Sequence, residues 1–213
     1  MQKISEIRKD YTKATLDVAT VKADPVEQFA QWLNEALKSE VNEPTALNLA
    51  TVNEHGRPTS RIVLLKGVEE KKFLFYTNYQ SKKGRELEAN PACALTFFWP
   101  ELERQVRIEG VAARVDEAVS DRYFQSRPRG SQIGAWSSPQ SSFIKDRDIL
   151  DERVKQIEKR FEGVDVLPRP NQWGGFEVEP VLFEFWQGRS GRLHDRLQYT
   201  LIDEVWQLQR LAP

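Results

Sequence analysis

Apolar residues recur along the chain with two periods, and each period predicts a different kind of element. The first stripe at helical spacing consists of Phe29, Trp32, Leu33, Ala36 and Leu37. Asp24 and Pro25 stand before it, as an N-cap and a proline at the first helical position do. The pattern therefore predicts a helix that ends near Leu37.

Alternating apolar and polar residues predict strands elsewhere in the chain. These segments are ALNLATV, the two apolar runs of RIVLLKGVEEKKFLFYTNY, CALTFFW and residues 104–115, 175–179, 181–187, 192–200 and 205–211. Turns such as His55-Gly56 join neighbouring strands, so the strands follow one another as hairpins. Eight or nine short strands in this order, with a few helices, favour an antiparallel barrel in a mainly β fold.

Other segments carry helical or irregular signals. Residues 3–16 are interpreted as a short helix in a mobile or docking arm, because they have little apolar surface. Asp116 can cap a helix through about Gln125, and residues 146–161 show the spacing of an amphipathic helix. Between them, SRPRGSQIGAWSSPQSS is rich in Ser, Gly, Pro and Arg, so it is either a loop or a site.

The composition is that of a globular protein of one domain with appendages. The chain has 213 residues, of which 39% are hydrophobic and 30% charged. No apolar run approaches the roughly 20 residues that span a bilayer, and the charged N-terminus lacks a secretory signal, so a cytoplasmic location is expected. The single cysteine, Cys93, excludes an internal disulfide. Because the net charge is −1, neither nucleic acid nor a membrane is expected as a partner.

Cations gather in residues 61–84. Lys82 and Lys83 fall in the first turn of a predicted helix, where backbone N–H groups and the helix dipole favour an anion. On the preceding strand, alternation puts Arg61 on one face and Lys66 on the other, so the two are expected to serve different anions. The sequence leaves two interpretations equally open, solvated surface charge and phosphate binding.

A second polar group lies in RLHDR. Alternation puts Arg192, His194 and Arg196 on one face of a predicted strand, and Leu193 and Asp195 on the other. A histidine by itself is more often structural, but the two flanking arginines favour a binding role.

Several well-known motifs are missing from the sequence. It contains no Walker-type glycine loop, GxGxxG, HExxH or nucleophile elbow. With two histidines and one cysteine, a zinc site would need carboxylates, and no metal is predicted. Single-stranded nucleic acid binding by basic and aromatic residues is a weaker alternative.

The motifs RIVLLKG, FYTNYQSKKG, LERQVRIEG, YFQSRPRGSQIGAW, PQSS and EFWQGRSGRLHDR, in this order and ending in RLAP, closely resemble the pyridoxine (pyridoxamine) 5′-phosphate oxidase family. The resemblance runs from about Arg8 to Pro213. It implies an antiparallel split β-barrel, the FMN-binding split barrel, that forms a homodimer with FMN in each of two interface clefts. It also implies an N-terminal arm or lid (residues 1–20) and a single FMN-binding domain (residues 21–213).

The family's FMN contacts match this chain residue by residue. They fall on Arg61, Ile62, Val63, Leu64, Leu65, Lys66, Tyr76, Thr77, Lys82 and Lys83 and, across the dimer, on Gln105, Gln140, Ser141, Trp186 and Arg196. Two positions depart from the family: Glu43 stands where Asp is common, and Lys82 where Arg is common. A lysine cannot make the bidentate phosphate contact of a guanidinium, so FMN affinity could be lower.

The substrate contacts implied by the resemblance are Arg8, Tyr11, Lys66, Tyr123, Arg127, Ser131, Arg192, Leu193 and His194. The phosphate would meet Lys66, Tyr123, Arg127 and Ser131. Arg192 and His194 would be the catalytic residues, lying over the pyridine ring and its phenolic oxygen. Arg8 and Tyr11 would belong to the lid.

The implied function is an FMN-dependent oxidase of vitamin B6 biosynthesis or salvage. It would convert pyridoxamine 5′-phosphate or pyridoxine 5′-phosphate to pyridoxal 5′-phosphate with O2 as acceptor, releasing H2O2, and ammonia from the amine. One alternative is a related FMN oxidase acting on another ring, as in phenazine-type pathways, but a substrate without phosphate would not need the four phosphate residues. The other alternative is a non-catalytic flavin or pyridoxal-phosphate binding module, which steady peroxide production would exclude.

Overall fold

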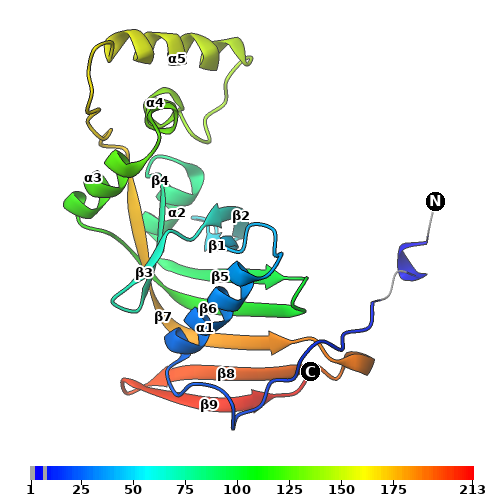
Figure 1. Ribbon diagram of the computed structural model, residues 1–213. Helices are drawn as coiled ribbons and strands as arrows, with labels where there is room; N and C mark the ends of the chain where they lie inside the picture. The colour runs from blue at the N-terminus through cyan, green and yellow to red at the C-terminus, as the bar shows by residue number, and fades with distance from the viewer. Residues whose placement is uncertain (1–2, 7–8) are drawn as a thin grey trace.

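A curled antiparallel sheet of nine strands forms the body of the described part of the chain. The structure is a computed structural model that describes residues 3–6 and 9–213 (Figure 1). The strand order is β2-β1-β5-β6-β7-β4-β3, and β8 pairs with both β7 and β9. The strands are β1 (Ala46–Val52), β2 (Pro58–Leu64), β3 (Gly67–Glu69), β4 (Lys72–Asn78), β5 (Ala92–Trp99), β6 (Arg104–Arg114), β7 (Trp173–Gln187), β8 (Asp195–Ile202) and β9 (Val205–Leu211). The prediction of a mainly β, antiparallel fold is confirmed.

Strand β7 connects the two halves of the sheet. Its 15 residues pair with β6 over most of their length, with β4 near the start and with β8 near the end. The sequence predicted two strands here, and that division was wrong. Pro180 has no N–H for the ladder, but the register shift between Glu109 and Gly110 of β6 accommodates it, and the strand continues.

The main core lies between this sheet and helix α1 (Pro25–Lys38). The predicted N-cap is confirmed, because the Asp24 side chain accepts a hydrogen bond of 2.8 Å from the Val26 N–H. Phe29 is fully buried and its ring lies 4.9 Å from that of Phe73, centroid to centroid. Trp32 meets Phe185 edge-on at 5.2 Å, so the helix closes one face of the curled sheet.

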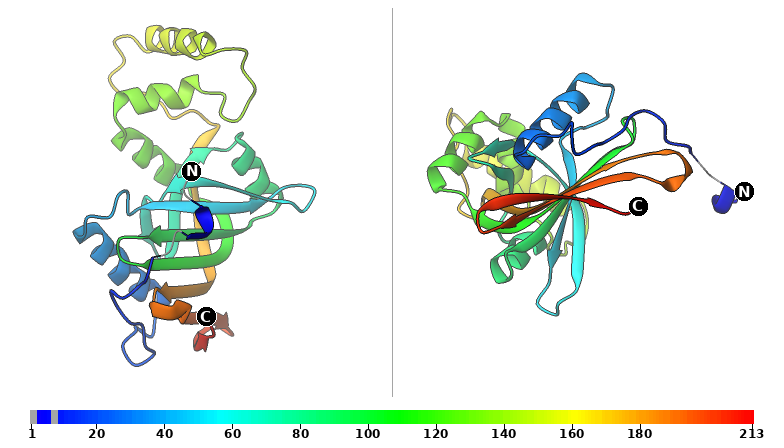
Figure 2. Two further views of the ribbon diagram at one scale, coloured as in Figure 1. Left: turned by 90° about the vertical axis from the view of Figure 1, so that its right-hand side faces the viewer. Right: turned by 90° about the horizontal axis from the view of Figure 1, so that it is seen from below.

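A second, smaller core lies under the helices that follow β6. Helices α3 (Glu117–Ser126), α4 (Arg129–Ser137) and α5 (Asp148–Arg160) form one end of the molecule, opposite to β8 and β9 (Figures 1 and 2). Phe124, Ile133, Phe161, Leu167 and Trp173 are buried there together. Helices α3 and α5 agree with the sequence prediction.

Helix α4 lies in the segment that the sequence left as either loop or site. Its Ser and Gly content conceals it, because these residues have weak helix propensity. Tertiary contacts stabilise the helix instead: Ile133 is buried, and the Gln132 side chain donates a hydrogen bond of 2.9 Å to the carbonyl of Phe124.

Residues 9–16 of the N-terminal arm form neither helix nor strand, so the helix predicted over residues 3–16 was wrong for that part. A single 3-10 turn covers Ile4–Glu6. The backbone N–H groups of Lys13 and Leu16 donate to the side chains of Glu103 and Asp195, at 3.0 and 3.1 Å. Because these donors are bonded to other elements, they are not available to a local helix.

Among the described residues, no helix combines the length and apolar composition that crossing a membrane requires.

Candidate functional site

The start of helix α2 (Lys82–Ala89) presents cations, as the sequence predicted. Ser81 caps the helix, its hydroxyl accepting from the Gly84 N–H at 3.3 Å. The Lys83 ammonium lies 3.2 Å from the Thr77 hydroxyl and 3.4 Å from the Gln140 carbonyl oxygen, both uncharged groups. Burial lowers the pKa of Lys83, and the nearby charge of Arg61 lowers it further. An anion bound here would relieve both effects, so the site fits a phosphate.

Arg61 lies behind this helix start in a polar network. Its two terminal nitrogens donate to Thr51 at 2.6 Å, to Thr59 at 2.7 Å and to Glu86 at 3.1 Å. Burial alone would raise the pKa of Glu86, but hydrogen bonds from the two threonines and Arg61 outweigh it, and the pKa is lowered. The Glu86 carboxylate therefore already balances the charge of Arg61.

Strand β2 carries the other predicted cofactor residues of this region. Arg61 and Val63 are half-buried and Leu65 is buried, whereas Ile62, Leu64 and Lys66 are exposed on the opposite face. The predicted separation of Arg61 from Lys66 is confirmed. Ile62 is 65% exposed, and an apolar side chain so exposed on a sheet face is typical of a binding or subunit surface.

Aromatic rings stack beside the α2 start. Tyr76 lies parallel to Tyr123 at 3.7 Å between centroids, and Trp173 continues the stack at 5.6 Å from Tyr76. The Arg127 guanidinium lies over the Trp173 ring at 4.5 Å. Burial raises the pKa of Tyr76 to about 12, so its hydroxyl stays protonated at neutral pH.

Arg127 has an unused hydrogen-bond donor. Its Nη1 is buried and meets no partner among the described residues. Burial lowers its pKa, although a guanidinium remains charged at neutral pH. A cleft of about 270 Å³ opens beside it, here called the phosphate cleft; its lining includes Ser131, Gln140 and Trp173. A buried cation with a spare donor in a cleft is suited to an anionic oxygen.

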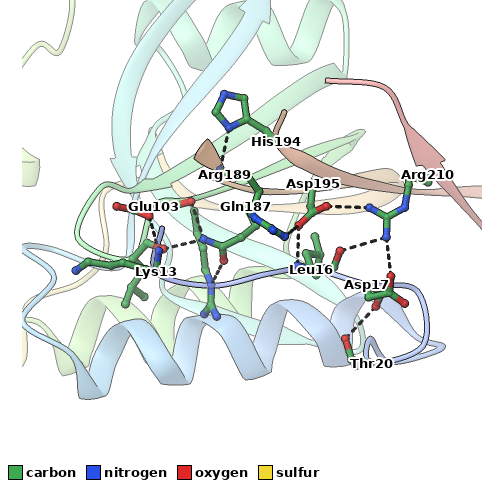
Figure 3. Close-up of polar contacts among 12 residues, drawn as sticks. Lys13, Leu16, Asp17, Thr20, Glu103, Gln187, Arg189, His194, Asp195 and Arg210 are labelled. Carbon is green, nitrogen blue, oxygen red and sulfur yellow. Dashed lines mark hydrogen bonds and ion pairs between the residues drawn. The ribbon is translucent and has the colours of Figure 1, made fainter. Parts of the chain in front are cut away.

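A second cleft, here called the ring cleft, lies at the far end of β7. Its volume is about 490 Å³, and its lining includes Tyr11, Arg189, Arg192 and His194. The His194 ring is 4.6 Å from Trp186 and 6.0 Å from Tyr11, centroid to centroid. The backbone N–H of Arg189 donates a hydrogen bond of 3.1 Å to Nδ1 of the His194 ring (Figure 3).

The predicted strand through RLHDR was wrong at its start. Strand β8 begins at Asp195, and Ser190–Arg192 forms a 3-10 turn in which Arg192 has φ +63°. Arg192 and His194 therefore do not share a strand face with Arg196. They line one cleft because the turn brings them together, and Leu193 between them is 73% exposed.

Gln105, Trp186 and Arg196 are neighbours across three strands. Gln105 of β6 pairs in register with Trp186 of β7, which pairs with Arg196 of β8. Arg196 donates to the buried Glu184 at 2.9 Å and to the Ala212 carbonyl at 2.8 Å. The three predicted cofactor residues thus form one group on the ring-cleft half of the molecule.

Gln140 was expected to act across the dimer with that group, and within this chain it lies apart from the group. It accepts a hydrogen bond of 3.1 Å from Thr77 of its own chain and lies beside Lys83. The loop after α4 folds back onto β4 and α2, which the local pattern could not show. Ser141 follows it with φ +69° and is exposed.

The two clefts lie at opposite ends of one strand. Trp173, the first residue of β7, lines the phosphate cleft, while Tyr11 of the ring cleft packs on Gly188, just beyond the last residue of β7. A strand of this length extends up to about 50 Å, several times the length of a small substrate. A substrate that touches both groups therefore needs one from each of two copies of the chain.

Sequence reasoning missed three residues of these clefts. Trp173 and Asn78 line the phosphate cleft, and Arg189 lines the ring cleft. Arg189 stands within the quoted motif EFWQGRSGRLHDR, which was a usable signal. Asn78 likewise stands within the quoted motif FYTNYQSKKG, and no local pattern indicated Trp173. Arg8 lies outside the described residues. Within the described ranges, no group of three or more His, Cys, Asp or Glu side chains could hold a metal ion.

Comparison with known families covers most of the chain. Residues 33–161 match the family model described as pyridoxamine 5′-phosphate oxidase. Residues 173–213 match the model of the pyridoxine 5′-phosphate oxidase C-terminal dimerisation region, which supports a homodimer. The chain is 53% identical to the pyridoxine/pyridoxamine 5′-phosphate oxidase of Ralstonia pickettii, over 100% of both chains. It is 50% identical to the enzyme of that name from Acaryochloris marina, over 99% of this chain and 95% of the relative.

Solved structures support the same fold. PhzG from Burkholderia lata 383, solved with tetrahydrophenazine-1-carboxylic acid, superposes with a TM-score of 0.86 at 31% identity, over 94% of this chain and 100% of that chain. A pyridoxamine 5′-phosphate oxidase-related, FMN-binding protein from Nostoc punctiforme superposes with a TM-score of 0.70 at 18% identity, over 91% and 100%. The second likeness shows the fold alone.

Proposed function

This chain belongs to the pyridoxamine 5′-phosphate oxidase family, whose members are oxidoreductases, and from that membership we propose that it oxidises pyridoxamine 5′-phosphate or pyridoxine 5′-phosphate to pyridoxal 5′-phosphate. The acceptor is O2, which leaves as H2O2, and the amine substrate also releases ammonia. The active site is composite, with the phosphate cleft of one copy facing the ring cleft of the other.

The main structural support for a phosphorylated substrate is the hydrogen-bond donor of Arg127 that has no partner among the described residues. A phosphate placed at its Nη1 would satisfy the only buried arginine nitrogen without a partner among the described residues. Ser131 lines the same cleft, and Tyr123 stacks on Tyr76 beside it. Lys66, exposed on the outer face of the β2 end, would add a further charge. A doubly charged group fixed by several donors orients the ring for reaction.

The cofactor proposed is FMN, and the residues around α2 fit its phosphate. Lys82 and Lys83 would hold it, helped by the helix N-terminus, and Thr77 and Gln140 would add hydrogen bonds. The strand Arg61–Leu65 would lie along the cofactor, and Tyr76 beside it. FMN, when bound, would supply the redox chemistry: it would take a hydride, which is two electrons with one proton, from the substrate carbon, and its two electrons would pass to O2.

The ring-cleft half would come from the second copy. Gln105, Trp186 and Arg196 would meet the cofactor there. Ser141 is proposed as a further contact from the α2 side, because it follows Gln140 in the chain. Arg192 and His194 are proposed as the catalytic residues that orient the pyridine ring and stabilise charge on its oxygen.

The N-terminal arm is proposed to cover the bound substrate. In this structure Tyr11 already lies in the ring cleft, where its side chain packs against Gly188 so closely that a Cβ there would come within 2.7 Å of the ring. Residues 1–20 would serve as this lid, and 21–213 as the cofactor-binding domain. Leu193, exposed at the cleft, would contact the substrate as the arm closes.

The phosphate distinguishes this function from that of the phenazine-type relative. The solved PhzG carries a ligand named as a carboxylic acid, and its identity to this chain is lower than that of the phosphate oxidases. A phosphate has more acceptor oxygens and more charge than a carboxylate, so it suits the combined donors of Lys66, Tyr123, Arg127 and Ser131 better.

An anaerobic titration tests the proposal. The purified protein, reconstituted with FMN, is titrated with pyridoxamine 5′-phosphate while the flavin absorbance is followed, and air is then admitted. Bleaching followed by return of the yellow colour, with pyridoxal 5′-phosphate and H2O2 formed, is the expected result. If the flavin binds but does not bleach, the proposed substrate is wrong. If no flavin binds, the proposed cofactor is wrong.

A further inference from the structure

The carboxylate of Asp195 is the centre of a hydrogen-bond network next to the ring cleft (Figure 3). Its Oδ2 accepts from the Arg189 guanidinium at 2.8 Å and from the Leu16 N–H at 3.1 Å, and its Oδ1 accepts from Arg210 at 3.0 Å. The side chain is 17% exposed. Burial alone would raise its pKa, but these three donors outweigh it and the pKa is lowered, so the group is ionised at neutral pH.

One branch of the network leads to the ring of His194. Arg189 is bonded through its side chain to Asp195, and through its backbone N–H to Nδ1 of His194 at 3.1 Å. A nitrogen that accepts a hydrogen bond carries no proton, so the neutral imidazole bears its proton on Nε2. The Nε2–H is then the group available to a ligand.

The loop between β7 and β8 is held at its start by the N–H of the buried Gly188, which donates to the Glu103 carbonyl at 2.7 Å, but the residues after Arg189 have fewer contacts. Ser190 and Gly191 are exposed, and Gly191 and Arg192 both have positive φ. The Ser190 hydroxyl bonds Asp10 of the arm at 2.9 Å, on the exposed side. The partly buried ion pair with Asp195 therefore fixes the side chain of Arg189, the residue whose backbone N–H orients His194.

We propose that Asp195 is a positioning residue of the active site, which acts through Arg189 to hold the His194 ring in its Nε2–H tautomer. This role rests on the proposed function of His194 toward the substrate ring. Asp195 has two other partners. Leu16 attaches the N-terminal arm to it and Arg210 attaches strand β9, and both contacts support the structure.

The test compares Asp195→Asn with Asp17→Asn. Asp17 is an exposed carboxylate that also pairs with Arg210, at 3.0 Å, and its hydrogen bonds do not involve Arg189. Both variants replace an aspartate by an asparagine. A difference between them in the state of His194 is therefore due to the link from Asp195 through Arg189. Flavin content and the thermal midpoint are measured for both proteins as controls of folding.

The first measurement is independent of activity. The chain has two histidines, and the second, His55, lies in the exposed turn before β2, so it is an internal reference. In protein labelled with ¹⁵N at histidine, His194 should show a bare Nδ1 and a protonated Nε2. In Asp195→Asn its two nitrogens should shift toward the averaged values of mixed tautomers, while the His55 signals and the Asp17→Asn spectrum stay as in the wild type.

The second measurement is kinetic. In Asp195→Asn the KM for pyridoxamine 5′-phosphate should rise and kcat should fall, each about three-fold, so that kcat/KM drops about ten-fold while the FMN content stays that of the wild type. The reason is that His194 no longer orients the substrate ring, whereas FMN binding does not depend on it. Asp17→Asn alters a contact of the arm and leaves Arg189 bonded to Asp195, so both constants should change less than in Asp195→Asn. A wild-type protein without oxidase activity would refute the proposed function, yet the spectra would still test the attachment of His194.

Unaltered His194 signals in Asp195→Asn would overturn the proposal, and so would altered signals with an unchanged KM. If Asp195→Asn does not fold, Arg189→Met replaces it, because the Arg189 side chain is 39% exposed and its loss removes only the link. The same shift of the His194 nitrogens is then expected, and its absence overturns the proposal.

Discussion

The guanidinium groups of Arg61 and Arg127 are both partly buried near helix α2 and strand β4, yet their donors are used differently. Those of Arg61 are directed to two threonines and Glu86. Arg127 has a buried Nη1 without a partner among the described residues. Because a buried donor without an acceptor costs stability, Arg127 is the arginine that gains most from a bound anion.

Replacing Arg127 by Ala should weaken substrate binding and leave the flavin in place. Loss of charge-assisted hydrogen bonds costs about 2 to 3 kcal/mol, which corresponds to a KM about 30- to 150-fold higher. Steady-state kinetics with pyridoxine 5′-phosphate measure this. Arg122→Ala, an exposed arginine of α3 near the same cleft, is the matched control and should behave as wild type. An unchanged KM in Arg127→Ala would remove this residue from the phosphate site.

If Lys83 holds the FMN phosphate as proposed, FMN binding should depend on pH. Its pKa lies below the usual 10.5 because of burial and then the charge of Arg61. FMN phosphate binds the charged form, so the affinity should be full below the lowered pKa and decline as the pH rises through it, in a range below that of an ordinary lysine. Quenching of FMN fluorescence as a function of pH measures the dissociation constant.

The variant Lys83→Met should bind FMN about ten-fold more weakly at neutral pH and lack this alkaline decline. Lys155→Met on the outer face of α5 is the control and should keep the wild-type profile. If Lys83→Met shows the same decline as the wild type, another group titrates and Lys83 is not the phosphate ligand.

At the scale of elements, helices α2 and α4 each have a glycine in the first turn, but the space around the two glycines differs. A Cβ on Gly84 of α2 would lie 2.2 Å from the backbone oxygen of Tyr79. A Cβ on Gly130 of α4 would meet nothing within 4 Å. Close approach of α2 to the end of β4 thus depends on glycine, and that approach places Lys83 beside Thr77.

Gly84→Ala should therefore destabilise the protein by about 3 kcal/mol and reduce FMN binding, because the helix start must move. Gly130→Ala should be neutral or stabilising by up to about 1 kcal/mol, since alanine has the higher helix propensity. Urea unfolding of the two variants measures the difference. Equal stabilities would show that α2 can shift without cost.

At the scale of the whole molecule, the proposal that one site combines clefts from two copies of the chain can be tested directly. Arg127 and His194 line different clefts of one chain, but would serve one site formed by two copies. In a mixture of Arg127→Ala and His194→Ala, each mixed dimer has one site with both changes and one site with neither.

At a substrate concentration far below the KM of Arg127→Ala, each variant alone should have little activity, and refolding the two together should restore it. Random assortment makes half of the dimers mixed, and half of their sites intact, so about a quarter of the wild-type activity is expected. The oxidase assay before and after co-refolding measures it, and each variant refolded alone is the control. Absence of recovery would mean that each site is built from a single chain.

The sequence by itself determined most of the elements and the types of residue at the site. The helix after Asp24, the strands β1, β2, β5, β6 and β9, and the cationic start of α2 follow from local periodicity, because each element must turn one apolar face to the core. The separation of Arg61 from Lys66 has the same origin.

Only the tertiary structure decided which of these residues meet. It made β7 one strand through Pro180, gave α4 its buried Ile133, turned Arg192 into the ring cleft and folded Gln140 back onto Thr77. Each of these features depends on contacts between segments far apart in the chain, which a local pattern does not encode. The distance between the two clefts has the same cause, and it is the reason for proposing that a complete site draws on two copies of the chain.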